Sequence, residues 1–403
     1  MTESWKTRLH ASIPWGSSTN SKASRLLPEE PEVIVRGDGC RVWDDKGREF
    51  IDYKVALGPV TLGHRFGAVD DAIRRQLEDG ISFGEPHPLE AEVAELFCSL
   101  VPGAEQARFL KTGGEANAAA IRLARAFTGR DHIVQIGYNG WLNSLALGAM
   151  TRPGHRADHP SGVPLALAEL HHQLPWNDLD ALEEVFGAYP GQIAAIVVAA
   201  DYAGMADGAT FYPALRQLAD REGALLIYDE IVTGFRIAIG GVSEYFGVVP
   251  DLAVFAKGLA NGMPLSVYTG RKDVLDLIDR GEVVVTSTLA GDALSLAAAK
   301  ATMTTYRERG VTDHMWRTST TLWDGVAQLF REFDVPLTVQ GFAPCPAIVP
   351  HPDSPGAFDD FVRAGYRNGV AIGGIPYVTF SHGDADIAET LDRLRTACEQ
   401  LQD

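Results

Sequence analysis

The chain has 403 residues, 46% of them hydrophobic, which is enough apolar material for one large core and a smaller second domain. Lys and Arg number 35 against 53 Asp and Glu, giving a formal net charge of −18. This acidic balance opposes binding to nucleic acid or to anionic membrane surfaces, and we expect neither as a partner.

The four cysteines lie far apart in the sequence and form no CxxC pair. Their spacing argues against a disulfide scaffold and against a zinc site, so we expect no metal. The first residues lack the apolar core of a signal peptide, and no run of about 18 apolar residues occurs anywhere. These features favour a cytoplasmic location.

The first predicted elements are short strands. Val33–Arg36 and Cys40–Trp43 flank a Gly-Asp-Gly turn, and Phe50–Tyr53 follows a second turn, which predicts a small antiparallel sheet. Beyond Gly58, helical periods alternate with the apolar runs ARFLKT, HIVQIG, IAAIVVAA, ALLIYDE, DLAVFAKG and PLSVYTG. Alternating helices and buried strands indicate an α/β fold with a mainly parallel sheet between helices. Residues 153–175 are predicted to be a long loop.

From about Gly291 a long helical stretch leads into a C-terminal section. Its strand candidates are LTVQGF and YVTFS, and its last helix is ADIAETLDRLRTACEQL. We expect residues 58–290 to form the large domain. Residues 1–57 and 291–403, the latter beginning with a linking helix, are expected to contribute a small α+β domain built from both chain ends.

Two charged side chains follow predicted strands. Asp229 in LLIYDE lies at the carboxyl end of a buried strand, where open α/β sheets present their ligands, although strand-end acids also serve as helix caps or ion-pair partners. Lys257 ends the strand DLAVFAK. Burial favours the neutral amine, which attacks carbonyl groups, whereas a lysine that extends to the surface would be structural.

The third element is a glycine turn before a helix, in FLKTGGEANAAAIRLARAFTG. Backbone N–H groups of Thr112, Gly113 and Gly114 lie at the predicted helix N-terminus, where phosphate can bind. Such a glycine turn is also a common connection between a strand and a helix without any ligand. A phosphate site, a carboxylate for a pyridine nitrogen and an amine able to form an imine match the three ends of pyridoxal 5′-phosphate (PLP). The combination predicts a PLP-dependent enzyme.

The sequence resembles the class III aminotransferases of the fold-type I PLP enzymes, and most closely their glutamate-1-semialdehyde aminomutase-like branch. The resemblance covers roughly residues 33–391. It rests on the ordered segments WDDKGREFIDY, GPVTLGH, ISFGEPHPLE, TGGEANAAAIRLARAFTGRD, YNGW, LLIYDEIVTGFR, EYFGVVPDLAVFAKG, STLAGD and FSHGDADIAETL.

The resemblance implies a role for each matching residue. Lys257 would hold PLP as a Schiff base and move protons, and Asp229 would pair with the pyridine nitrogen. Gly113 and Gly114 match the phosphate turn, which usually reads SGTEA. Tyr138 corresponds to the aromatic residue that stacks on the ring.

Further matches concern the ring's other face, the partner subunit and the substrate. Ile231 matches the apolar residue on the second face of the ring, although a core role is equally compatible. Thr288 matches the threonine that reaches the neighbouring subunit's cofactor, which implies a homodimer with shared active sites. Arg25 resembles a carboxylate-binding arginine, with a spacing that differs by about one residue. Glu230 and Arg236 match too, but we assign them structural roles.

Several departures from the usual motifs concern the substrate, among them GGG after the lysine, which reads ANG, and the missing acid-proline pair before the strand of Asp229. The motif YHG reads YNG here, with Asn139 at its centre, and Leu57 replaces an aromatic residue before GP. The phosphate turn and the lysine are retained, so the departures bear on the substrate and not on the cofactor.

We expect an aminotransferase that moves an amino group from an amino donor to a small carbonyl acceptor, which is a keto compound, an aldehyde or a keto-sugar. An intramolecular aminomutase and a PLP-dependent epimerase would use the same residues. A non-catalytic PLP-binding regulator is disfavoured, because it would need an added DNA-binding domain. A plain structural α/β protein would bind no PLP.

Overall fold

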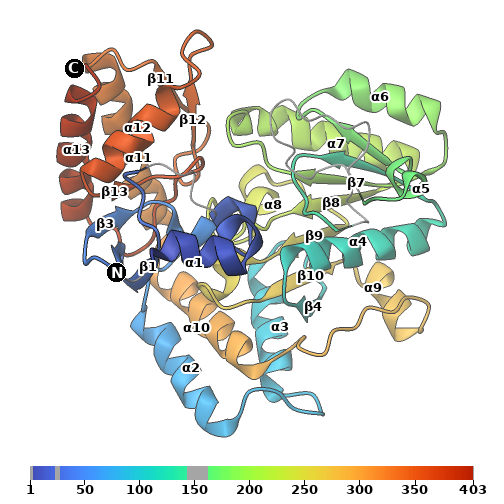
Figure 1. Ribbon diagram of the computed structural model, residues 1–403. Helices are drawn as coiled ribbons and strands as arrows, with labels where there is room; N and C mark the ends of the chain where they lie inside the picture. The colour runs from blue at the N-terminus through green and yellow to red at the C-terminus, as the bar shows by residue number, and fades with distance from the viewer. Residues whose placement is uncertain (1–2, 23–27, 143–161, 403) are drawn as a thin grey trace. The chain divides into compact units, whose positions relative to one another are not determined.

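The computed structural model describes residues 3–22, 28–142 and 162–402. The chain divides into two compact units, one made of residues 1–67 and 313–403 and the other of residues 68–312 (Figure 1). The first unit therefore contains both ends of the chain. The domain limits expected at residues 57 and 290 stay a prediction.

The unit of residues 68–312 is built on a seven-stranded sheet in the order β4-β10-β9-β8-β7-β5-β6, as far as the described residues show. Strand β10 runs antiparallel to β4 and β9, and the remaining pairings are parallel. The predicted α/β fold with a mainly parallel sheet is confirmed. The strands are β4 (Gln106–Leu110), β5 (His132–Ile136), β6 (His171–Leu174), β7 (Ile193–Ala199), β8 (Leu225–Asp229), β9 (Leu252–Phe255) and β10 (Ser266–Gly270).

Helices cover both faces of this sheet. Ile227 packs in one core cluster with residues of helix α4 (Gly113–Thr128), whereas the ring of Tyr228 contacts Tyr212 of helix α7 (Gly208–Glu222) at 5.1 Å between centroids. Successive side chains of a strand point to opposite faces, so α4 and α7 lie on opposite sides of β8. Asp229 alternates with Tyr228 and therefore points to the α4 side.

The remaining helices of this unit come before, between or after the strands of the large sheet in the chain (Figure 1). They are α2 (Gly67–Asp79), α3 (Pro88–Leu100), α5 (Leu165–Ala168), α6 (Leu179–Ala188), α8 (Gly241–Phe246), α9 (Lys272–Asp279), α10 (Ala293–Arg309) and the 3-10 turns η5 (Met205–Asp207) and η6 (Lys257–Ala260). Helix α2 begins at the last residue of the first unit. Among the described helices, none combines the length and apolar character that crossing a membrane requires.

The prediction of a long loop over residues 153–175 is wrong for the second part of this range. Residues 153–161 lie outside the described part of the chain, but Leu165–Ala168 form helix α5 and His171–Leu174 form the edge strand β6. The sequence HHQL carries no apolar alternation. Pairing with β5 stabilises it as a strand, and the sequence pattern alone did not show this.

The unit of residues 1–67 and 313–403 contains a four-stranded sheet in the order β1-β2-β3-β13 and the hairpin β11-β12. Its segment YVTFS, which was predicted as a strand, is irregular. Two isolated backbone hydrogen bonds hold it, from Tyr377 N to Tyr53 O and from Phe380 N to Thr61 O. The elements of this unit are α1 (Trp5–Ser12), η1 (Pro14–Gly16), η2 (Asn20–Lys22), β1 (Ile34–Asp38), β2 (Arg41–Asp44), β3 (Glu49–Asp52), η3 (Val55–Leu57), β11 (Leu337–Gln340), β12 (Ala347–Pro350), α12 (Ala357–Arg367), β13 (Val370–Ala371), α13 (Asp384–Glu399) and α11 (Val311–Glu332), which begins in the other unit.

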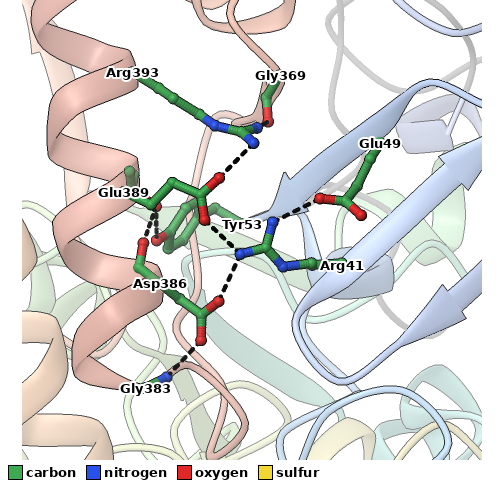
Figure 2. Close-up of polar contacts among 9 residues, drawn as sticks. Arg41, Glu49, Tyr53, Gly369, Gly383, Asp386, Glu389 and Arg393 are labelled. Atoms are coloured by element: carbon green, nitrogen blue, oxygen red, sulfur yellow. Dashed lines mark hydrogen bonds and ion pairs between the residues drawn. The ribbon is translucent and has the colours of Figure 1, made fainter.

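Arg41 joins the two ends of the chain within this unit (Figure 2). Its guanidinium donates to Glu49 at 2.6 Å on one side, and to Asp386 at 2.8 Å and Glu389 at 2.6 Å of α13 on the other. Arg393 donates to the second oxygen of Glu389 at 2.5 Å. Because the sequence places strand β2 and helix α13 more than 300 residues apart, only the folded chain brings these charges together.

Candidate active site

Four segments end at the same edge of the large sheet. Strands β5, β8 and β9 run parallel, and β4 shares their direction because β10 is antiparallel to both β4 and β9. The residues after these strands therefore meet at their carboxyl ends, the usual ligand edge of an open α/β sheet. The predicted residues Gly113, Tyr138, Asp229 and Lys257 all lie there.

Asp229 is the last residue of β8 and only 7% exposed. Its Oδ2 accepts from Asn117 Nδ2 at 2.7 Å and Asn139 Nδ2 at 3.2 Å, and its Oδ1 accepts from the Ile231 N–H at 3.1 Å. Burial raises the pKa of the Asp229 carboxyl, although these donors and the nearby charge of Lys257 oppose that rise. A buried carboxylate held by neutral donors is suited to a cationic ligand group.

Lys257 is half-buried and begins the 3-10 turn η6, two residues after β9 ends at Phe255. The expected position on the strand itself was therefore off by two residues. Its backbone has φ 43, in the left-handed region that side chains disfavour. Such backbone strain clusters at functional sites. The positive charge of Lys257 lowers the pKa of the Asp229 carboxyl, against the effect of burial.

The glycine turn opens helix α4 through a capping box. The Thr112 hydroxyl accepts from Glu115 N at 3.3 Å, and Glu115 Oε2 accepts from the Thr112 N–H at 2.8 Å. The Thr112 N–H is therefore already hydrogen-bonded within the turn, whereas we expected from the sequence that it would be available to phosphate. Within the described residues, no acceptor takes the N–H groups of Gly113 or Gly114, which stay available to an anion.

Gly113 brings the turn against the segment that follows β8. A Cβ added to Gly113 would lie 2.2 Å from Ile231 Cδ1, so only glycine fits there without movement. The side chain of Ile231 is partly buried against the core under α4. The glycine turn and Ile231 are therefore in close contact.

Tyr138 lies on the loop after β5 and is 54% exposed. Partial burial raises the pKa of the Tyr138 hydroxyl, and the negative charge of Asp229 adds to the rise. Tyr138 directly precedes Asn139, whose side chain donates to Asp229, so the two residues share the loop that contacts this carboxylate. An exposed ring next to the carboxylate leaves an aromatic surface that a flat ligand can cover.

Two predicted residues are not joined to this group. Thr288 is exposed in the loop before α10, and no hydrogen bond among the described residues links it to Asp229, Lys257 or the glycine turn. Arg25 lies outside the described residues.

The residues that sequence reasoning missed are the amide donors. Asn117 lies one helical turn after Gly113 on α4, a spacing that places it beside the turn, and its full burial marks it as a polar group with a function in the fold. Asn139 was noticed only as a departure from a motif. Its side-chain contact with Asp229 needed the folded chain.

Glu230 and Arg236 are both buried. Glu230 accepts from Val242 N at 2.9 Å and Ser243 N at 3.0 Å at the start of α8, and also from the Thr233 hydroxyl. Burial raises the pKa of the Glu230 carboxyl to about 7. These contacts are those of a group that stabilises the turn after β8.

The site fits PLP by three observations. Asp229 is a buried carboxylate whose hydrogen-bond donors are neutral, Gly113 and Gly114 present N–H groups, and Lys257 lies within charge range of the carboxylate. These are the partners that the pyridine nitrogen, the phosphate and the aldehyde of PLP require. Among the described residues, no group of three or more His, Cys, Asp and Glu is arranged to hold a metal ion.

Comparison with known proteins identifies the family of this chain. The family model described as Aminotransferase class-III matches residues 27–397. A solved structure of the FumI protein of Sphingopyxis sp. MTA144, in its PLP internal aldimine form, is 27% identical with a TM-score of 0.90, and the match covers 98% of this chain and 95% of that one.

More distant structures share the fold. An omega-transaminase from Sphaerobacter thermophilus is 24% identical with a TM-score of 0.88, over 99% of this chain and 97% of that one. A glutamate-1-semialdehyde aminomutase from Pseudomonas aeruginosa PAO1 is 23% identical with a TM-score of 0.81, over 98% of this chain and 93% of that one.

Proposed function

Because the chain belongs to the class III aminotransferases and is a PLP-dependent enzyme, we propose that it transfers an amino group from an amino donor to a small carbonyl acceptor. The acceptor is a keto compound, an aldehyde or a keto-sugar. The observation that carries the proposal is the cluster of Asp229, Lys257 and the glycine turn at one sheet edge.

Bound PLP supplies an electron sink that stabilises negative charge on the carbon bearing the amino group. In the proposal, Lys257 Nζ would hold the cofactor's aldehyde, and after the donor amine displaces it the freed Nζ would move the proton at that carbon. Asp229 keeps the pyridine nitrogen protonated. The N–H groups of Gly113 and Gly114 bind the phosphate.

Tyr138 and Ile231 are proposed to flank the ring. Tyr138 has an exposed ring beside Asp229, and Ile231 contacts the position of Gly113. An aromatic face on one side and an aliphatic side chain on the other would orient a flat cofactor and exclude water from its faces.

The proposal includes a homodimer. Exposed apolar side chains occur next to Thr288 in the sequence and on the segment that is hydrogen-bonded to the start of α10: Leu289 is 56% exposed, and Ile81 and Phe83 are 47% and 51% exposed. A hydrogen bond from Ala293 N to Ile81 O, 2.9 Å long, holds these two segments together. Apolar exposure of this kind is typical of a protein interface, and a second copy would bring its Thr288 to the site.

Mixing two inactive variants tests the shared site. A dimer with one Lys257→Ala subunit and one Thr288→Ala subunit has one site with both residues intact, so activity should return on mixing. No recovery, in a sample where two differently tagged subunits co-purify and so prove that mixed dimers form, would contradict the sharing of Thr288.

A donor screen tests the reaction. Each candidate amine is added to the PLP-loaded enzyme, and the loss of the lysine-bound cofactor's absorbance is followed. Amino transfer requires a second, carbonyl substrate to restore that absorbance. Product formed from a single substrate, without an external donor or acceptor, would instead show an aminomutase, and loss of configuration without amino transfer would show an epimerase.

A further inference from the structure

Two buried side-chain amides meet on one oxygen of Asp229. Asn117 Nδ2 lies 2.7 Å from Asp229 Oδ2, and Asn139 Nδ2 lies 3.2 Å from the same atom. Both asparagine side chains belong to fully buried residues, each 0% exposed. Neither amide titrates, so both donate hydrogen bonds without supplying a counter-charge.

Asn117 also fixes the loop that carries Tyr138. Its Nδ2 donates to the backbone carbonyl of Asn139 at 3.0 Å as well as to Asp229. An amide nitrogen has two N–H donors, so both are used. One side chain on α4 thereby sets the position of the loop after β5 relative to the end of β8.

The two carboxylate oxygens of Asp229 accept different numbers of hydrogen bonds. A carboxylate oxygen accepts about two hydrogen bonds, and Oδ2 already accepts two, from the amides. Oδ1 accepts one, from the Ile231 N–H at 3.1 Å, which leaves it one acceptor position. Within the described residues, Oδ1 is the oxygen with room for another donor.

Resting on the function proposed above, we propose that Asn117 and Asn139 are positioning residues that hold Asp229 ionised and leave Oδ1 to accept the pyridine N–H of PLP. Asn117 and Asn139 are amides, which cannot become cations. The negative charge of Asp229 is then left for the pyridine nitrogen over the whole working pH range.

Gln135 provides a matched control. It is a third buried amide, on β5, and it is 0% exposed. Neither its Nε2 nor its Oε1 has a hydrogen-bond partner among the described residues. Gln135→Leu therefore removes a buried amide without removing a donor to Asp229.

The experiment uses PLP with an isotope-labelled pyridine nitrogen, bound to the full-length enzyme and followed by NMR. Asn139→Leu and Asn117→Leu keep the side-chain volume roughly constant and remove the donor. We expect the nitrogen resonance to move from the protonated toward the deprotonated position. Binding of PLP should weaken about 10- to 100-fold, the range for losing a hydrogen bond to a charged group.

Asn139→His returns one N–H donor at the cost of a different shape. In its neutral form, measured at a pH above the usual histidine range, the imidazole should restore the resonance and the affinity, whereas Gln135→Leu should leave both unchanged. Asn117→Leu also removes the hydrogen bond that holds the Tyr138 loop, so this protein could fail to fold. In that case the comparison of Asn139→Leu with Asn139→His decides the outcome.

The proposal is overturned if both leucine variants keep the wild-type resonance and affinity, if Asn139→His is as perturbed as Asn139→Leu, or if Gln135→Leu causes the same loss. Asp229→Asn separates this proposal from the proposed function. If it leaves the nitrogen protonated, the role of Asp229 itself is wrong. If it deprotonates the nitrogen while the leucine variants do not, only the role of the amides fails.

Discussion

Replacing Gly113 by alanine places a methyl group in space that Ile231 occupies. The added Cβ would lie 2.2 Å from Ile231 Cδ1 and 2.9 Å from Cγ1, whereas ordinary contacts begin at 3.4 Å. Cδ1 would have to retreat by at least 3.4 − 2.2 = 1.2 Å. Overpacking of this kind destabilises a protein by about 1–3 kcal/mol.

The neighbouring Gly114 supplies the control. Its added Cβ would lie 3.7 Å from Leu142 Cγ, an ordinary contact. Both glycines begin the same helix, so both alanines gain roughly 0.5–1 kcal/mol of helix preference, and that gain cancels between the two variants. The unfolding free energies of Gly113→Ala and Gly114→Ala should therefore differ by the clash alone, about 1–3 kcal/mol.

The assay is denaturant unfolding of the cofactor-free variants at one protein concentration, because bound cofactor and subunit association both shift apparent stability. In an Ile231→Ala background the opposing side chain is absent, so Gly113→Ala should cost much less there than in the wild-type background. PLP affinity should fall in Gly113→Ala, because the displaced Ile231 is proposed to contact the ring. Equal stability of the two alanine variants would refute the steric reasoning.

Three further outcomes are expected. Lys257→Ala should abolish the absorbance of lysine-bound PLP and nearly all turnover, and normal activity in this variant would rule out the mechanism. His382 is fully buried, and burial lowers its pKa from 6.5 to about 4, so the unfolded chain binds a proton that the folded chain does not between these values. The unfolding free energy should therefore fall by at most about 3 kcal/mol as the pH is lowered from 6.5 to 4. Denaturant unfolding at several pH values should show that the unfolding free energy of His382→Gln depends less steeply on pH than that of the wild type. Arg41→Leu should reduce the unfolding free energy by about 1–3 kcal/mol, because it leaves Asp386 and Glu389 without their shared cation, whereas Arg395→Leu, at an exposed pair, should change the denaturation midpoint less.

The sequence predicted the parts of the fold that depend on local pattern. Each of the six apolar runs from ARFLKT to PLSVYTG coincides with a strand of the large sheet to within two residues at its start, because a strand buried on both faces needs a continuous apolar segment. The edge strand β6 and the irregular course of YVTFS were missed. In both segments the partners of the backbone hydrogen bonds, and not the local pattern, determine the structure.

For the site, the sequence by itself determined the chemical types: the lysine after one strand, the carboxylate at the end of another and the glycines before a helix. Their order and the resemblance to a family were enough to predict the cofactor. Each of these residues is placed by its own strand or helix, and strand ends meet at one edge of a parallel sheet, so their proximity followed from the fold class.

Only the tertiary structure decided how these groups are held. That Asn117 and Asn139 share one oxygen of Asp229, and that Gly113 must lack a side chain because of Ile231, depends on distances between segments far apart in the chain. Hydrogen bonds and steric contacts change over tenths of an ångström, a precision that residue order and periodicity do not contain.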